Sequence, residues 1–215
     1  MDKYFREPMN SLTHFMGAIL AIVALIAMII KGISVNISTI GLVSVIIFGV
    51  SMILLYTVSA TYHAVISTDK IIKAFRRLDH SMIFILIAGS YAPFCLIALD
   101  GTMGKVFFTI MILVALGGII FKMCWFNCPR WLQTSLYIIM GWSALFVIKP
   151  LSHTLTPVPM MLLVLGGVFY TIGGIIYGVK PKKLQIGSFG FHEIFHIFIL
   201  LGSLSHFICV YTYLL

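Results

Sequence analysis

Seven long apolar stretches constrain the fold of this chain more than any other feature of its sequence. A helix that crosses a bilayer needs about 20 mostly apolar residues, and the stretches have roughly that length. The expected spans are Ser11–Ile30, Ile37–Ile66, Ser81–Leu99, Val106–Trp125, Trp131–Ile148, Val158–Tyr177 and Phe191–Leu215.

The composition excludes an ordinary soluble domain. Hydrophobic residues make up 61% of the 215 residues and charged residues 9%, whereas a soluble domain has about 25% charged residues. The first apolar stretch is not followed by a cleavage pattern, so we expect it to remain in the mature protein. The sequence therefore predicts one all-α domain over residues 1–215, a seven-transmembrane-helix bundle in the cell membrane.

The basic residues predict the orientation of this bundle. Of 14 lysines and arginines, only Lys31, Lys105 and Lys149 fall on one side of the expected membrane. Loops rich in Lys and Arg stay in the cytoplasm, which predicts a cytoplasmic N-terminus and a C-terminus outside. With the positive charge so close to lipid, we expect the net charge of +8 to attract anionic lipid headgroups and not nucleic acid.

Ionisable residues at the ends of the expected spans converge at one depth, near the predicted cytoplasmic face. Such residues are costly in a membrane and are mostly functional. They come from four different parts of the sequence: His14, His63, Asp79, His80, His192, Glu193 and His196.

Three of these histidines have the pattern of a metal site. His192 and His196 are four residues apart and share one helix face, and His63 stands one turn after Ser59 on another helix. Three imidazoles and one open position are typical of catalytic zinc. Asp79 could then orient or deprotonate a bound water, or hold a ligand histidine in its tautomer.

Two other interpretations of these histidines stay open. His192, Glu193 and His196 spell H-E-x-x-H, the zinc protease motif, in which Glu193 would be the base and Asp79 the third ligand. That interpretation leaves His63 without a role, so we prefer the three histidines, with Glu193 at the rim near Lys180–Lys183. Histidines at helix ends also often simply face headgroups.

The remaining histidines are expected to be structural. We expect His14 and His80 to form hydrogen bonds at the inner rim. His206 lies ten residues beyond His196, about 15 Å deeper along a helix, and is expected to bridge two helices by a hydrogen bond. His153 is expected at the outer interface.

Cys124 and Cys128 are four residues apart in a short connection. We expect two reduced thiols there, because no other ligand type stands beside them. A second metal site at this pair stays open.

Five motifs, in this order across seven spans, resemble the hemolysin III family, the bacterial branch of the progestin and adipoQ receptor superfamily. They are EPMNSLTH (7–14), SATYH (59–63), LDHS (78–81), GSYAP (89–93) and HEIFH (192–196).

The resemblance implies a seven-helix bundle with its N-terminus inside and a zinc ion near the cytoplasmic face. By motif position the zinc ligands would be His63, His192 and His196. Asp79 would bind the zinc-held water, with Ser59 beside it. Members of the superfamily are proposed to be ceramidase-like hydrolases of lipid amides, and bacterial members take their name from cytolytic activity ascribed to some.

The expected function is therefore zinc-dependent hydrolysis of a lipid amide or ester at the cytoplasmic face, with membrane lipids as partners. Two alternatives stay open: a cytolytic membrane protein, and a regulator of membrane lipids that holds structural zinc. A pore would need a polar stripe through the bilayer, whereas the ionisable groups here gather at one face.

Overall fold

Seven long helical rods form the protein in its computed structural model, which describes residues 5–99, 101–181, 183–186 and 189–215. All seven are long and apolar enough to cross a membrane. Lys3 and Lys182, which entered the prediction of orientation, lie outside the described residues. The helices are α1 (Pro8–Ser34), α2 (Thr39–Ala64), α3 (Asp69–Pro93), α4 (Gly101–Cys124), α5 (Arg130–Trp142), α6 (Ile148–Thr154), α7 (Pro157–Val179) and α8 (Phe191–Cys209). α5 and α6 belong to one of the seven rods, Arg130–Thr154.

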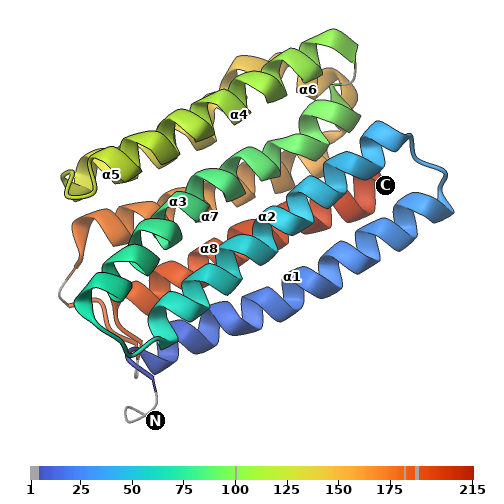
Figure 1. Ribbon diagram of the computed structural model, residues 1–215. Coiled ribbons are helices and arrows are strands. Elements are labelled where there is room, and N and C mark those ends of the chain that lie inside the picture. Colours follow the sequence, from blue (N-terminus) through green and yellow to red (C-terminus); the bar gives the residue numbers. More distant parts are fainter. Residues whose placement is uncertain (1–4, 100, 182, 187–188) are drawn as a thin grey trace.

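Helices that follow one another in sequence mostly pack side by side. α1 packs on α2, α2 on α3 and α7 on α8, while α1 also contacts α8. The ribbon shows the two chain termini at opposite ends of the bundle (Figure 1). The end of α2 and the start of α8 therefore lie at the same end as the N-terminus.

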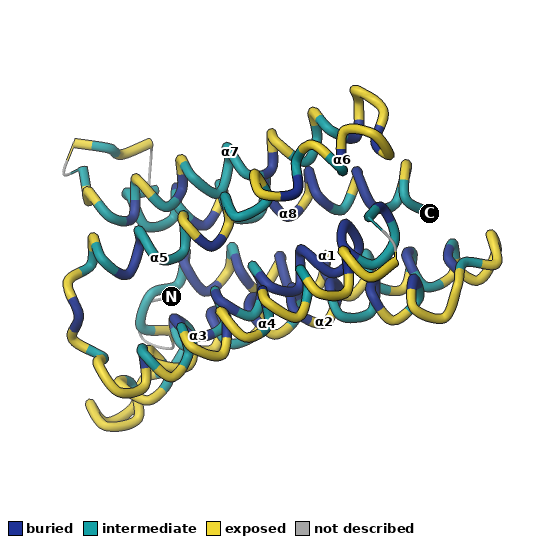
Figure 2. Tube along the Cα trace, turned by 90° about the horizontal axis from the view of Figure 1, so that it is seen from above, coloured by how far each residue is buried: buried dark blue, intermediate teal, exposed yellow. Residues whose placement is uncertain are grey.

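The bundle is built for an apolar solvent. Buried positions face the interior and exposed positions the outside (Figure 2). The interior includes fully buried Met28, Val45 and Phe48, yet large apolar side chains such as Leu113 and Ile120 are more than 60% exposed. In a membrane this outer surface contacts acyl chains, and helices satisfy their own backbone hydrogen bonds there.

The structure differs from the expected spans in two places. α3 begins at Asp69, twelve residues before the expected start, because the amphipathic segment 69–80 continues the helix without a break. The expected fifth span is also interrupted. A 3₁₀ segment at Ser143–Val147 joins α5 to α6, and the helical path continues to Thr154.

The proline in the third span, Pro93, has a local effect on its helix. α3 ends at Pro93 and is followed directly by a π-helical turn, Phe94–Ala98. Proline removes one backbone N–H donor from a helix, and in membrane helices local π-helical adjustments help to satisfy the freed backbone groups.

Candidate metal centre

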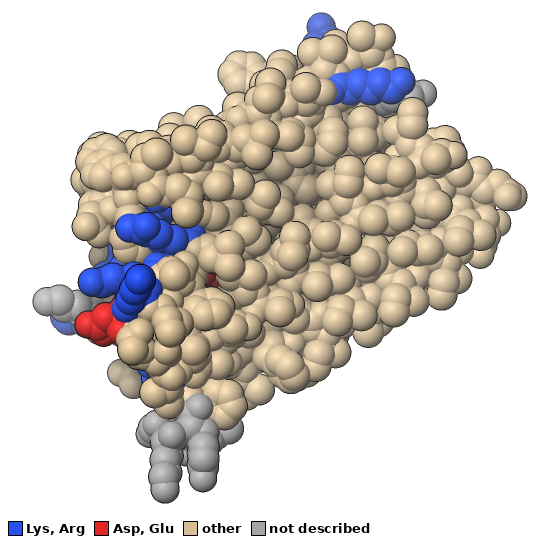
Figure 3. Space-filling view, viewed as in Figure 1, with Lys and Arg blue, Asp and Glu red and all other residues tan. Residues whose placement is uncertain are grey.

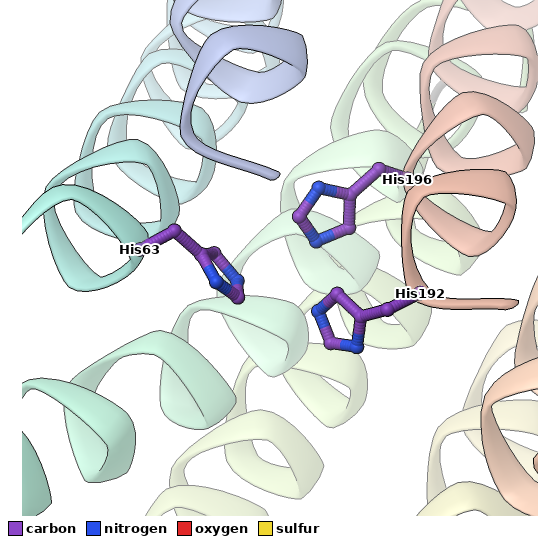
Figure 4. A group of neighbouring side chains, drawn as sticks. All are labelled: His63, His192 and His196. Carbon is purple, nitrogen blue, oxygen red and sulfur yellow. The ribbon is translucent and has the colours of Figure 1, made fainter. Parts of the chain in front are cut away.

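Two helices bring three histidine rings together at the N-terminal end of the bundle. His63 lies in the last turn of α2, and His192 and His196 lie in the first two turns of α8. One nitrogen of each ring lies within 4.8 Å of the others, and the three rings converge between the helices (Figure 4). The structure thus confirms the juxtaposition that the sequence predicted.

The start of α8 is fixed by its own first turn. Glu193 accepts a hydrogen bond from the backbone N–H of Gly190, at 2.9 Å from nitrogen to oxygen, in the manner of a capping box. We expected Glu193 only at the rim near Lys180–Lys183, and the structure adds a capping role that the sequence analysis did not assign. The Glu193 carboxylate caps the helix that carries two of the three histidines.

The tautomer of His63 follows from its neighbour Glu7. The Nδ1 atom of His63 lies 2.5 Å from Oε2 of Glu7. This hydrogen bond, with the charge of Arg6 contributing, lowers the pKa of Glu7 to about 2, against an opposing effect of partial burial. Since an ionised carboxylate can only accept, Nδ1 of His63 carries the proton.

In the neutral ring of His63, the proton on Nδ1 leaves a lone pair on the other ring nitrogen. The residue is 1% exposed, and Nε2 has no hydrogen-bond partner among the described residues. A buried polar atom without a partner is unusual and calls for an explanation. A metal ion shared with the two neighbouring rings supplies one.

His196 is held in the same tautomer by Thr13 of α1. Oγ1 of Thr13 donates its only proton to the carbonyl oxygen of Asn10, at 2.9 Å. It also lies 3.0 Å from Nδ1 of His196, so it must accept there and the ring must donate. Nε2 of His196 therefore also keeps its lone pair.

His14 supports this ring in a way that differs from our expectation. It is buried, and neither of its ring nitrogens has a hydrogen-bond partner among the described residues, so the expected hydrogen bond is wrong. Instead its ring stacks on that of His196, with 3.6 Å between centroids and an interplanar angle of 10°. Stacking fixes the plane of the His196 ring.

Asp79 and Ser59 stand beside the three histidines. The Asp79 carboxyl group interacts with the hydroxyl of Ser59 and with the ring of His63. All three line one cavity together with His192 and His196. The two residues predicted to assist the metal site are thus brought to it.

This cavity has a volume of about 440 Å³ and continues from the histidines into the apolar interior. Its deeper walls include Phe94, Leu99, Ile148, Leu151 and Leu163. The histidine cluster therefore lies on the wall of a space large enough for part of a lipid.

The other histidines and the cysteines have the expected structural roles. His80 lies 3.3 Å from the hydroxyl of Tyr177 on α7. Nε2 of His206 lies 3.1 Å from the carbonyl oxygen of Leu163, which bridges α8 to α7. His153 is exposed near the end of α6, and Cys124 and Cys128 are free thiols.

Sequence reasoning missed the roles of Glu7 and Thr13. Both belong to the segment 7–14, which the sequence placed at the same depth as the histidines. The backbone N–H of Glu7 donates to the carbonyl oxygen of His63, at 2.9 Å, and Oγ of Ser11 donates to that of Ala60, at 3.0 Å. The shared depth was the one available signal, since contacts across about 50 and 180 residues leave no periodic pattern.

Comparison with known proteins agrees with this architecture. The sequence model of the family described as Haemolysin-III related matches residues 3–207. "Hemolysin-3" of Bacillus cereus is 42% identical over 218 residues, covering 100% of this chain and 95% of the relative. The "Hemolysin-3 homolog" of Bacillus subtilis is 40% identical over 207 residues, covering 96% and 93%.

A more distant relative is found in animals. Human "Monocyte to macrophage differentiation factor" is 25% identical over 173 residues, which cover 78% of this chain and 69% of the relative. With the family model extending over nearly the whole chain, from before the first span into the seventh, this multi-pass membrane protein belongs to the Haemolysin-III related family.

Proposed function

We propose that the protein is a zinc-dependent hydrolase of lipid amide or ester bonds, ceramidase-like in chemistry, that acts at the cytoplasmic face of the membrane. The observation that carries the proposal is the cluster of His63, His192 and His196 on the wall of an internal cavity. The predicted orientation, with the N-terminus in the cytoplasm, is part of the proposal.

The donor set fits zinc. Neutral imidazole is a common zinc ligand, and three protein ligands with an open fourth position are typical of catalytic sites. Ligand histidines almost always donate their second ring N–H to a carboxylate, carbonyl or other acceptor. Glu7 and Thr13 accept in this way from His63 and His196.

Zinc in this position would supply Lewis acidity, which activates water and polarises a carbonyl group. The chain's own residues would handle the proton and the substrate. Asp79, which lines the same cavity as His63 and Ser59, would take a proton from the attacking water and return it to the leaving group. Ser59 would hold the Asp79 carboxylate by a hydrogen bond.

A lipid is the substrate class that the cavity favours. At the end of the bundle that carries the histidines its lining includes exposed Arg76 and Lys180, and its deep walls are apolar. An acyl chain in the interior would place its carbonyl group near the histidines at that end. Burial of the chain would contribute about 0.8 kcal/mol per CH₂ group.

Zinc counting on the purified protein tests the metal site. We expect one zinc ion per chain in wild type and in His153→Ala, a control in an exposed histidine. We expect loss of most of this zinc in His63→Ala, His192→Ala and His196→Ala. Full occupancy in all three variants would remove the basis of the proposal.

Hydrolysis of ceramide-like lipids tests the chemistry. General acid–base catalysis typically contributes 10²–10⁴-fold, so Asp79→Asn should lower kcat by at least about 100-fold while zinc stays bound. Equal rates in wild type and Asp79→Asn would exclude the role assigned to Asp79.

The names of the two Bacillus relatives support one alternative, a cytolytic membrane protein. Release of haemoglobin from erythrocytes by purified wild-type protein, undiminished in His63→Ala, would favour cytolysis over hydrolysis. A second alternative is a lipid regulator with structural zinc. It predicts bound zinc without turnover of any lipid.

A further inference from the structure

Three cationic side chains line the cavity at the end of the bundle that carries the histidines. Arg76 belongs to the second turn of α3, Arg130 begins α5, and Lys180 directly follows α7. Arg76 and Lys180 are exposed and Arg130 is half-buried. We call these three residues the cationic mouth, and Figure 3 shows basic side chains gathered at this end of the molecule.

The cationic mouth is within electrostatic reach of the histidine cluster. Arg130 interacts with His192, and Arg76 interacts with Asp79. A ligand held by these cations would therefore also lie next to the candidate metal centre.

Aromatic rings hold the two arginines in place. The guanidinium of Arg130 lies 4.7 Å from the centre of the Tyr177 ring and donates to the carbonyl oxygen of Tyr177, at 3.4 Å. Arg76 lies 5.3 Å from the centre of the Phe126 ring. A guanidinium stacked on a ring keeps the N–H groups along its edge, which suit the paired oxygens of a phosphate or carboxylate.

The carboxylates of the site do not neutralise the cationic mouth. Glu7 is engaged by Arg6, at 3.3 Å, and by His63. Asp79 contributes a single negative charge, and within the described ranges none of the three mouth cations forms an ion pair. This end of the cavity therefore keeps a net positive charge beside an apolar interior.

We infer that the cationic mouth binds the phosphate-type anionic headgroup of a lipid whose acyl chain occupies the cavity. This inference rests on the proposed function, because it names the substrate class of the same site. It favours acyl lipids that carry a phosphate over uncharged lipids such as ceramide or diacylglycerol. Free phosphate carries the same group and could also bind to the cationic mouth.

Binding measured by calorimetry on the zinc-loaded full chain in neutral detergent tests this inference without turnover. The probes are a short-chain phosphatidic acid, the matched diacylglycerol without phosphate, and inorganic phosphate as competitor. We expect the phosphatidic acid to bind at least about tenfold more tightly than the diacylglycerol, since a hydrogen bond to a charged group contributes enough for that ratio.

Arg130→Gln should lower the ratio of the affinity for phosphatidic acid to that for diacylglycerol by about tenfold. The matched control is Arg77→Gln. Arg77 is the neighbour of Arg76, carries the same charge and also lies over Phe126, at 5.0 Å, but does not line the cavity. We expect the affinity of the Arg77→Gln variant for phosphatidic acid to stay within about twofold of wild type.

Equal affinity for the two lipids would overturn the inference, and so would equal losses in Arg130→Gln and Arg77→Gln. Competition by inorganic phosphate would identify a general phosphate site, and lack of competition would identify an intact lipid headgroup. Zinc content is measured in the same samples. A failure of the metal site is therefore distinguishable from a failure of the cationic mouth.

Discussion

Replacement of Glu7 by glutamine tests how the chain prepares His63 for a metal ion. Oε2 of Glu7 lies 2.5 Å from Nδ1 of His63, and the low pKa of Glu7, about 2, keeps it ionised at neutral pH. Glu7→Gln preserves the shape of the side chain but removes its charge. It therefore weakens the interaction that fixes the tautomer and the basicity of His63.

The expected loss can be estimated from the structure. Loss of such an outer partner typically lowers metal affinity 10–100-fold. The side chain of Glu7 is 40% exposed, so water replaces part of the lost interaction and the lower end of the range applies. We expect about a tenfold loss of zinc affinity, which corresponds to about 1.4 kcal/mol.

Competition with a chromophoric zinc chelator measures this affinity on the purified protein. The matched control is Glu193→Gln, a carboxylate at the same end of the bundle that caps α8 through Gly190. Its zinc affinity should change less than threefold, although its melting temperature should fall. Unchanged affinity in Glu7→Gln, or equal losses in the two variants, would refute the role assigned to Glu7.

Three further predictions follow from the same contacts. Thr13→Val removes the acceptor of His196 Nδ1 and should lower zinc affinity about tenfold in the same chelator assay; an unchanged affinity would contradict this. Tyr56→Phe removes the hydrogen bond from Tyr56 to Ser203, 2.6 Å long. It should cost about 1 kcal/mol of stability, seen as a lower midpoint of thermal unfolding, whereas the exposed Tyr213→Phe should show no change. Removal of zinc by chelation should also lower that midpoint, because a ligand at 100 times its Kd stabilises the folded state by about 2.7 kcal/mol; a midpoint independent of zinc would contradict a site in the folded protein.

The helical fold and the meeting of the histidines could be predicted from the sequence. Long apolar stretches specify spans directly, because backbone groups in lipid must be paired within a helix. The spans then place His63 and the His192–His196 pair at one depth. The helical repeat places the pair on one face, and the structure confirms that all three rings converge.

The partners of these histidines could not be predicted in the same way. Which side chain reaches His63 or His196 depends on the rotation of each helix about its axis, and hydropathy does not determine that rotation in a bundle surrounded by lipid. The stacking of His14 on His196 and the Glu7 contact to His63 are results of such rotation. The capping by Glu193 was also missed, because the carboxylate was assigned to distant lysines and not to its own helix start.

X-ray absorption at the zinc edge of the purified, zinc-loaded protein tests the central claim most directly. The account predicts one zinc ion per chain with three imidazole nitrogens at about 2.0–2.1 Å, from His63, His192 and His196. Sulfur ligands at about 2.3 Å would instead locate the metal at Cys124 and Cys128. That result, or a spectrum unchanged in His63→Ala, would contradict the account.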